Sequence, residues 1–155
     1  MEPHNYNVDI DWKNSHNGII CSPELKRENG ISIRVGTPPS LHEGIAGLWT
    51  PEHLFVAAVN GCLMTTFLVF AKNAILDFTN FTCQAVGKLE MVEGTFMMSD
   101  ILLNPTVVIT DEMHRKKALR ILKKAKNKCS IVHSIKSKIT IETTVRVEPV
   151  LIENT

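Results

Sequence analysis

The sequence is short of excess charge, of aromatic residues and of clustered cysteines. Its 155 residues hold 17 Lys and Arg against 16 Asp and Glu, a formal charge of +1, and only 6% are Phe, Trp or Tyr. A chain so close to neutral has no overall field that would attract nucleic acid or an anionic membrane. The 44% share of hydrophobic residues excludes disorder as the main state. The length predicts a single domain over residues 1–155, with a core that needs neither disulfides nor metal.

The four cysteines, Cys21, Cys62, Cys83 and Cys129, form no Cys-x-x-Cys pair and no Cys/His cluster with the spacing of a zinc site. We therefore expect no metal and no cofactor. The N-terminal residues lack the basic and apolar stretches of a secretory signal, so the expected location is the cytoplasm, where thiols stay reduced. A cysteine on an apolar helix is, taken alone, most often a packing residue.

Charged residues are absent altogether from His53 to Ala71. This segment is just long enough to resemble a membrane span. Asn60 and Gly61 interrupt it, and no stretch rich in Lys and Arg precedes it to set an orientation, so we interpret it as a buried helix rather than a membrane span. A helix that is apolar on nearly all sides must be covered on all sides, and we expect a second subunit to supply part of that cover.

The spacing of polar and apolar residues predicts an α+β chain, with a strand-rich part at 1–49 and a helix–sheet–helix–strand part at 50–155. A loop rich in Gly and Pro joins the two parts, and Thr50 and Pro51 are typical of a helix start. The predicted elements are, in order, strands at 7–12, 18–21 and 30–35, a helix at 51–73, two or three antiparallel strands around 81–85, 95–99 and 105–109, a basic helix at 111–128 and a strand at 137–147.

The segment WTPEHLFVAAVNGCL, residues 49–63, resembles the signature of the OsmC/Ohr family of thiol-dependent peroxidases. In that family a Pro-Glu pair opens a long buried helix, and the reactive cysteine follows ten residues after the Glu, as Cys62 follows Glu52 here. The family's second cysteine comes after a helix, and the segment AKNKCSIVHS places Cys129 in that position. Because the order of elements also agrees, the resemblance implies an OsmC-like fold and an intertwined homodimer.

The resemblance also implies a role for each of these residues. Cys62 would attack the peroxide as a thiolate, and an ordinary thiol is only a few per cent ionised at pH 7, so a neighbouring group must lower its pKa. In the family this group is an Arg held by the Glu that corresponds to Glu52. Cys129 would then condense with the Cys62 sulfenic acid to give a disulfide. The implied partners are an organic hydroperoxide and an external dithiol reductant of the lipoyl or thioredoxin type, in an antioxidant stress response.

Two features of this chain depart from the family pattern. The segments 13–18 (KNSHNG) and 40–44 (SLHEG), where members carry the Arg, contain none. The residues that could supply the positive charge instead are Lys13, His16, Arg27, Arg34 and His42. The second departure is Ser130, because most members have Pro directly after the second cysteine.

Two other functions stay open beside the peroxidase. The same fold could bind an apolar small molecule near Cys62 without turnover, which the missing Arg and the apolar residues Phe55 and Met64 favour. Core packing is the simpler account of Phe67 and Phe70. The basic helix at 111–128 could contact nucleic acid, but no aromatic residues interleave with its Lys and Arg. We therefore expect neither nucleic acid nor a membrane as a partner.

Overall fold

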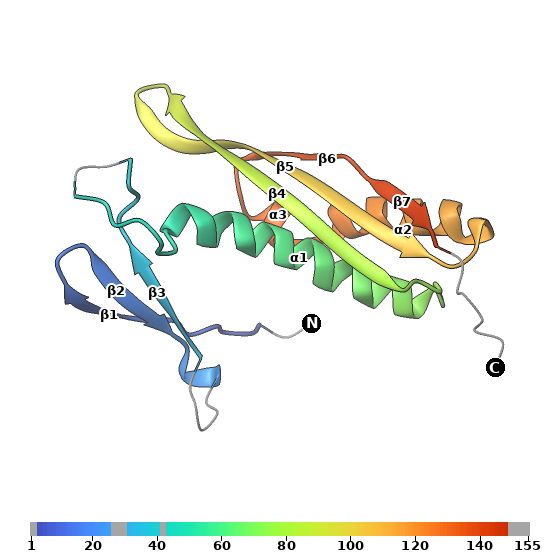
Figure 1. Ribbon diagram of the computed structural model, residues 1–155, viewed down its shortest axis with the longest axis horizontal. Helices are drawn as coiled ribbons and strands as arrows, with labels where there is room; N and C mark the ends of the chain where they lie inside the picture. The colour runs from blue at the N-terminus through green and yellow to red at the C-terminus, as the bar shows by residue number, and fades with distance from the viewer. Residues whose placement is uncertain (1–2, 26–30, 41–42, 149–155) are drawn as a thin grey trace. The chain divides into compact units, whose positions relative to one another are not determined.

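The computed structural model describes residues 3–25, 31–40 and 43–148 (Figure 1). The chain divides into two compact units, Met1–Leu54 and Phe55–Thr155. The division lies close to the one predicted between residues 49 and 50. That the two units form a single domain stays a prediction.

The first unit is a three-stranded antiparallel sheet in the order β1-β2-β3 (Figure 1). Its elements are β1 (Asp9–Asn14), β2 (Asn17–Cys21), the short 3-10 helix η1 (Pro23–Leu25) and β3 (Ser32–Gly36). The predicted meander is thus confirmed. The amide of Gly36 donates to the carbonyl of Trp49 at 2.9 Å, which fastens the end of the Gly/Pro-rich loop to β3. A Cβ at Gly36 would lie 2.9 Å from the end of the Leu48 side chain and 3.2 Å from the His16 carbonyl oxygen, so a larger residue there would force these neighbours to shift.

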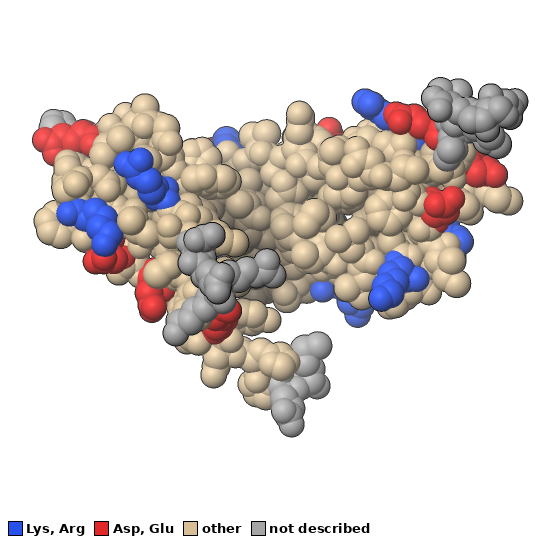
Figure 2. All heavy atoms as spheres, turned by 60° about the horizontal axis from the view of Figure 1, so that its bottom comes forward, with Lys and Arg blue, Asp and Glu red and all other residues tan. Residues whose placement is uncertain are grey.

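Helix α1 (Pro51–Asn73) begins and ends at the predicted residues. Thr50 Oγ1 accepts the amide of His53 at 3.4 Å, and Glu52 adds negative charge to the first turn. One stripe of the helix is buried: Val59, Leu63, Phe67 and Ala71. Other apolar residues stay uncovered in the single chain, with Leu68 41% and Val69 57% exposed. Much of the surface seen in Figure 2 carries no charged side chain.

By length and composition alone, α1 could cross a membrane. The core helix of a soluble protein satisfies the same criteria. In the described chain only one stripe of α1 is buried, so the expectation of a helix covered on all sides is not met by a single copy.

The second unit contains a four-stranded sheet built on a long antiparallel hairpin (Figure 1). Strands β4 (Asn80–Val92) and β5 (Thr95–Ile109) are joined by Glu93 and Gly94, both with positive φ, which is the backbone of a tight type I′ turn. Inward residues of β5 pack on the buried stripe of α1, and the Phe67 ring lies 4.9 Å from that of Phe81. Phe67 is therefore a core residue.

The C-terminal segment pairs parallel with β5, so the prediction of an antiparallel sheet is wrong here: the sheet is mixed. The segment also forms two strands, β6 (Lys138–Ile141) and β7 (Thr144–Val147), rather than the single strand predicted. Strands β6 and β7 pair with β5 in the same register, and the interruption between them lies opposite Pro105. The carbonyls of Leu103 and Ile109 accept hydrogen bonds from this side, so by alternation Pro105 would donate here if it had an N–H.

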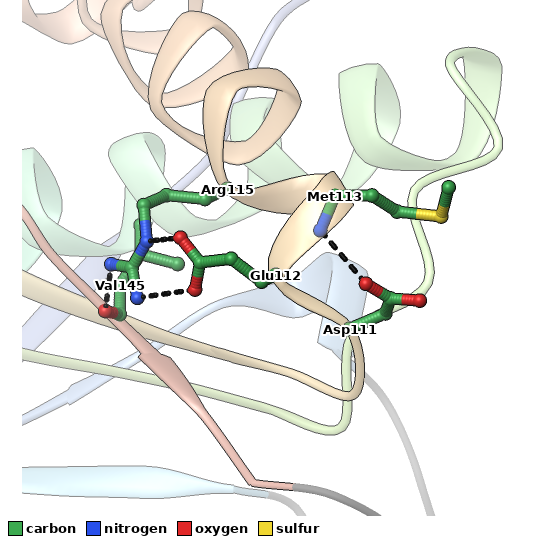
Figure 3. Close-up of polar contacts among 5 residues, drawn as sticks. All are labelled: Asp111, Glu112, Met113, Arg115 and Val145. Atoms are coloured by element: carbon green, nitrogen blue, oxygen red, sulfur yellow. Dashed lines mark hydrogen bonds and ion pairs between the residues drawn. The ribbon is translucent and has the colours of Figure 1, made fainter.

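The basic helix begins with a short 3-10 turn, η2 (Glu112–His114), followed by α2 (Arg115–Lys128). Asp111 Oδ1 accepts the amide of Met113 at 2.8 Å and so caps the start of η2 (Figure 3). The Arg115 guanidinium binds Glu112 and also donates to the carbonyl of Val145 at 2.6 Å, which ties α2 to β7 (Figure 3). The buried side of α2 is the predicted one: Ala118, Ile121, Leu122 and Ala125. A four-residue helix, α3 (Ser130–His133), follows and was not predicted.

Candidate active site at Cys62 and Cys129

Two cysteines that are 67 residues apart in the sequence interact in the second unit. Cys62 lies inside α1, and Cys129 lies at the junction of α2 and α3. The Sγ atom of Cys62 is 3.9 Å from Ser130 Oγ and 3.9 Å from Thr66 Oγ1, one turn further along α1. All four cysteines are free thiols, and Cys62 is half-buried whereas Cys129 is completely buried. The site therefore unites an accessible thiol, a buried thiol and two hydroxyl groups.

The surroundings of Cys62 favour its thiolate. Burial acts to raise the pKa of Cys62, but hydrogen bonds from the Cys129 thiol and the Ile131 amide outweigh it and hold the pKa below its ordinary value. The hydroxyls of Ser130 and Thr66 act in the same direction on the Cys62 pKa. A hydrogen-bond donor stabilises the anion more than the neutral thiol, which is why each of them has this effect.

Cys129 is shifted the opposite way. Burial, and its interaction with Cys62, raise the pKa of Cys129 to about 11. Within the pair, Cys62 is thus the thiol that ionises more readily, and Cys129 keeps its proton and donates it to the Cys62 sulfur. A thiolate is the nucleophilic form of cysteine, so this arrangement suits Cys62 to attack and Cys129 to condense with its oxidised product.

The break between α2 and α3 supplies the backbone donor. Cys129 has extended backbone angles, φ −68° and ψ 116°, and serves both as the C-cap of α2 and as the N-cap of α3. The first amides of a helix have no partner within it. Because α3 starts at Ser130, the Ile131 amide is free to bind the Cys62 sulfur. Neither α3 nor the Ile131 amide was predicted; a serine directly after Cys129 was the only local sign of a new helix start.

Glu52 lies apart from this cluster. It stands in the first turn of α1, ten residues before Cys62, which is about 15 Å of helix rise. In the first unit it lines a cavity of about 730 Å3, together with Trp12 and His16. Its Oε2 atom is buried and has no hydrogen-bond partner among the described residues. Glu52 is not one of the groups that shift the Cys62 pKa, so its catalytic role stays a prediction.

The residues predicted to supply a positive charge to Cys62 have other surroundings in the structure. Lys13 is paired with Asp11, the His16 ring lies 2.6 Å from a Glu43 carboxylate oxygen, and Arg34 is an exposed residue of β3. Arg27 and His42 lie outside the described residues. Among residues 3–25, 31–40 and 43–148, no charged side chain contributes to the shift of the Cys62 pKa. In the described part of the chain, the groups that lower the Cys62 pKa are hydrogen-bond donors.

The remaining predicted site features are placed as follows. Phe70 packs partly against the core, and Lys124 Nζ lies 4.3 Å above its ring. Phe55 and Met64 are exposed on α1 at 37% and 40%. The described residues contain no group of three or more His, Cys, Asp and Glu that could hold a metal ion.

Comparison with known proteins decides the family. The family model described as OsmC-like protein matches residues 44–144, which include Glu52, Cys62 and Cys129. The chain belongs to the OsmC-like family. The resemblance drawn from residues 49–63 is thereby confirmed, as is the α+β fold class.

Several solved structures share the OsmC-like fold. An OsmC-like protein of unknown function from Vibrio cholerae is 21% identical, with a TM-score of 0.80 over 91% of this chain and 99% of its own. An organic hydroperoxide resistance protein from Elizabethkingia anophelis is 20% identical, with a TM-score of 0.70 over 95% and 99%. An OsmC-like protein from Mycoplasma pneumoniae is 13% identical, with a TM-score of 0.72 over 94% and 99%. No curated protein sequence matches the chain. At such identities these structures establish the fold alone.

Proposed function

We propose that this OsmC-like protein is a thiol-dependent peroxidase that reduces organic hydroperoxides, with Cys62 as nucleophile and Cys129 as resolving thiol. The observation that carries the proposal is the opposite shift of the two thiols, because Cys62 has a lowered pKa and Cys129 a raised one. Membership of a family that includes organic hydroperoxide resistance proteins supports the same class of reaction.

The reaction begins at the sulfur of Cys62. Its thiolate attacks one oxygen of the hydroperoxide, the O–O bond breaks, and the alkoxide leaves and takes up a proton to become an alcohol. Cys62 is then a sulfenic acid. The Cys129 sulfur attacks the Cys62 sulfur, water leaves, and a disulfide joins the two residues. An external dithiol restores both thiols with two electrons and two protons.

Hydrogen bonds are proposed to do the work that an Arg does elsewhere in the family. A proline at position 130 would bring no hydroxyl to Cys62, whereas Ser130 brings its Oγ to 3.9 Å from the sulfur. Together with Thr66 and the Ile131 amide, Ser130 surrounds the thiolate with neutral donors. Such donors lower the Cys62 pKa without adding a charged side chain, so the site can still bind an uncharged substrate.

The exposed apolar side chains of α1 near Cys62 favour an apolar substrate. Phe55 lies seven residues before Cys62 and Val69 seven after it, so both share its face of the helix, and both are exposed. An alkyl chain buried there gains about 25 cal/mol per Å2 of apolar surface, a gain that hydrogen peroxide cannot make. We therefore propose that cumene hydroperoxide is reduced faster than hydrogen peroxide.

We also propose a homodimer. The apolar face of α1 and the exposed side of β1, where Ile10 is 69% and Trp12 72% exposed, lack cover in one chain. Large exposed apolar surfaces usually mark interfaces. A second copy would cover both, and a monomeric mass in sedimentation at micromolar concentration would exclude it.

Peptide mapping after one equivalent of cumene hydroperoxide tests the reaction. We expect a Cys62–Cys129 disulfide in the wild type. In Cys129→Ser we expect a sulfenic acid at Cys62 that reacts with a dimedone-type probe. Cys83→Ser is the matched control, because burial raises the pKa of Cys83 and should leave it unreactive. Four free thiols in the wild type would contradict the peroxidase and favour the alternative, an OsmC-fold module that binds an apolar small molecule without turnover.

A further inference from the structure

Positive charge is concentrated on one helix of this molecule. The fourteen residues of α2 include eight Lys and Arg and no Asp or Glu. The rest of the sequence holds nine Lys and Arg against sixteen Asp and Glu, a net charge of −7. The near-neutral total therefore conceals a strongly basic helix on a negatively charged remainder.

The exposed side of α2 carries a row of these residues. We call this row the basic strip, and its members are Lys116, Arg120, Lys123, Lys124 and Lys128. The strip lies opposite the buried side that packs on the core. Lys124 lies over the Phe70 ring, and within the described part of the chain the other four form no ion pair. The charges of the strip are thus largely left to solvent or to a partner.

Helix stability does not account for the strip. Lys116 and Arg120 are four residues apart, as are Arg120 and Lys124, and like charges at this spacing destabilise a helix. Arg115 and Lys116 also stand in the first turn, where the helix dipole disfavours cations. Only the cations in the last turn, such as Lys128, agree with the dipole. An external anionic surface would remove these repulsions.

The strip leads directly to the thiol site. Lys128 is followed by Cys129 and by the exposed residue Ser130, whose hydroxyl is 3.9 Å from the Cys62 sulfur. From Lys116 to Lys128 the helix rises about 18 Å. An anion of that length is a macromolecular surface rather than a small ligand, and its end would lie beside the reacting sulfur atoms.

We propose that the basic strip docks an acidic protein that carries the dithiol which reduces the Cys62–Cys129 disulfide. This inference rests on the proposed function, which supplies the disulfide. A partner thiolate attacks the Cys62 sulfur, since Cys129 is completely buried. The Cys62–Cys129 bond breaks, and Cys129 leaves and takes up a proton. The partner's second thiol then breaks the mixed disulfide, so the partner ends as a disulfide and Cys62 as a thiolate.

A protein partner fits the strip better than nucleic acid does. The other exposed residues of this side are Leu119 and Asn127, so the strip offers no aromatic ring on which a base could stack. The negative remainder of the molecule would also repel a long phosphate backbone. An acidic protein surface needs only local complementarity, which chiefly accelerates encounter.

The test compares two synthetic dithiol peptides as reductants of the oxidised protein. One carries Cys-Gly-Pro-Cys next to six Glu, and the other has six Gln instead. We expect the Glu peptide to react about tenfold faster or more at low salt and the advantage to fade as salt rises. For each protein, the rate of reduction by the Glu peptide is divided by the rate of reduction by dithiothreitol. This ratio should fall in the variant Lys116→Glu/Arg120→Glu/Lys123→Glu. It should hold in the control of equal charge, Lys136→Glu/Lys138→Glu/Arg146→Glu, whose residues are exposed outside the strip.

Equal rates with the two peptides, or equal losses in the two triple variants, would overturn the proposal. A redox-silent Glu peptide, with Ser in place of Cys and a fluorescent label, separates docking from chemistry. If no Cys62–Cys129 disulfide forms, the proposed function fails, while strip-dependent anisotropy of this peptide would still support an acidic partner. Tighter binding of a single-stranded DNA of equal charge would overturn the protein partner in favour of nucleic acid.

Discussion

The two units of the chain differ in how far their apolar side chains are buried. In the second unit, α1, α2 and the mixed sheet enclose one continuous core, in which Phe67, Leu103 and Leu122 are fully buried. In the first unit Val35 is the buried hydrophobic residue among those described, while Ile10 and Trp12 of β1 are largely exposed. The second unit can therefore hold a site of fixed geometry by itself, whereas the first depends on cover from elsewhere.

The site follows the same division. Cys62, Cys129, Ser130 and Thr66 all belong to the second unit, and the groups that shift the two thiol pKa values do so too. The first unit contains Glu52, whose buried Oε2 has no hydrogen-bond partner among the residues that the structure describes, and the candidate cations Lys13, His16 and Arg34. We therefore expect substitutions in the second unit to alter the thiol chemistry and the free energy of unfolding, and substitutions in the first unit to alter dimer assembly.

The largest expected effect is the loss of activity in Cys62→Ser. An alcohol has a pKa far above that of a thiol and cannot supply the nucleophile, so reduction of cumene hydroperoxide should fall below detection. The matched change in the first unit, Cys21→Ser, should leave the rate as it is, because Cys21 lies exposed in β2. Steady-state peroxide consumption measures both. Activity that survives in Cys62→Ser would place the chemistry elsewhere.

Core substitutions compare the stability of the two units. Phe67→Ala removes a ring whose centroid lies 5.3 Å from that of Phe78 and 4.9 Å from that of Phe81. This change should lower the free energy of unfolding by about 3–5 kcal/mol. Val35→Ala, in the first unit, should lower it by about 1–2 kcal/mol. Urea unfolding with linear extrapolation measures the difference. Equal losses would mean that the first unit is as tightly packed as the second.

The exposed side of β1 tests assembly. Ile10→Ser/Trp12→Ser should shift the protein from dimer toward monomer at micromolar concentration, because it removes apolar area that the proposed partner covers. Met113→Ser, another exposed apolar residue, serves as the control. Sedimentation velocity gives the mass of each. A dimer that resists the double change would show that β1 is not part of the interface.

The smallest expected effect concerns the Cys62 thiolate. Ser130→Ala removes a donor that lowers the pKa of Cys62, so that pKa should rise and the thiolate fraction at pH 6.5 should fall. Alkylation of Cys62 at this pH should become several-fold slower, while the rate well above the pKa should be unchanged. Ser134→Ala, at the C-cap of α3, is the control, because its hydroxyl donates to the carbonyl of Ser130 and not to Cys62. An unaltered pH profile would remove Ser130 from the site.

Local rules account for much of what could be predicted. The start of α1 was predicted to the residue, because Thr50 and Pro51 act on the turn that immediately follows them. The buried side of α2 followed from the 3.6-residue period. The single C-terminal strand was nearly right, yet its break depends on Pro105, which precedes it by more than thirty residues.

The sequence by itself determined where α1 begins and which side of the basic helix is apolar, because capping and periodicity act over a few residues. The family resemblance singled out Cys62 and Cys129. The tertiary structure alone decided that Cys62 and Cys129 interact, that α3 turns the Ile131 amide toward them, and that their pKa values separate. Burial and hydrogen bonding set those pKa values, and both depend on groups 67 to 69 residues from Cys62 that only the packed second unit brings to it.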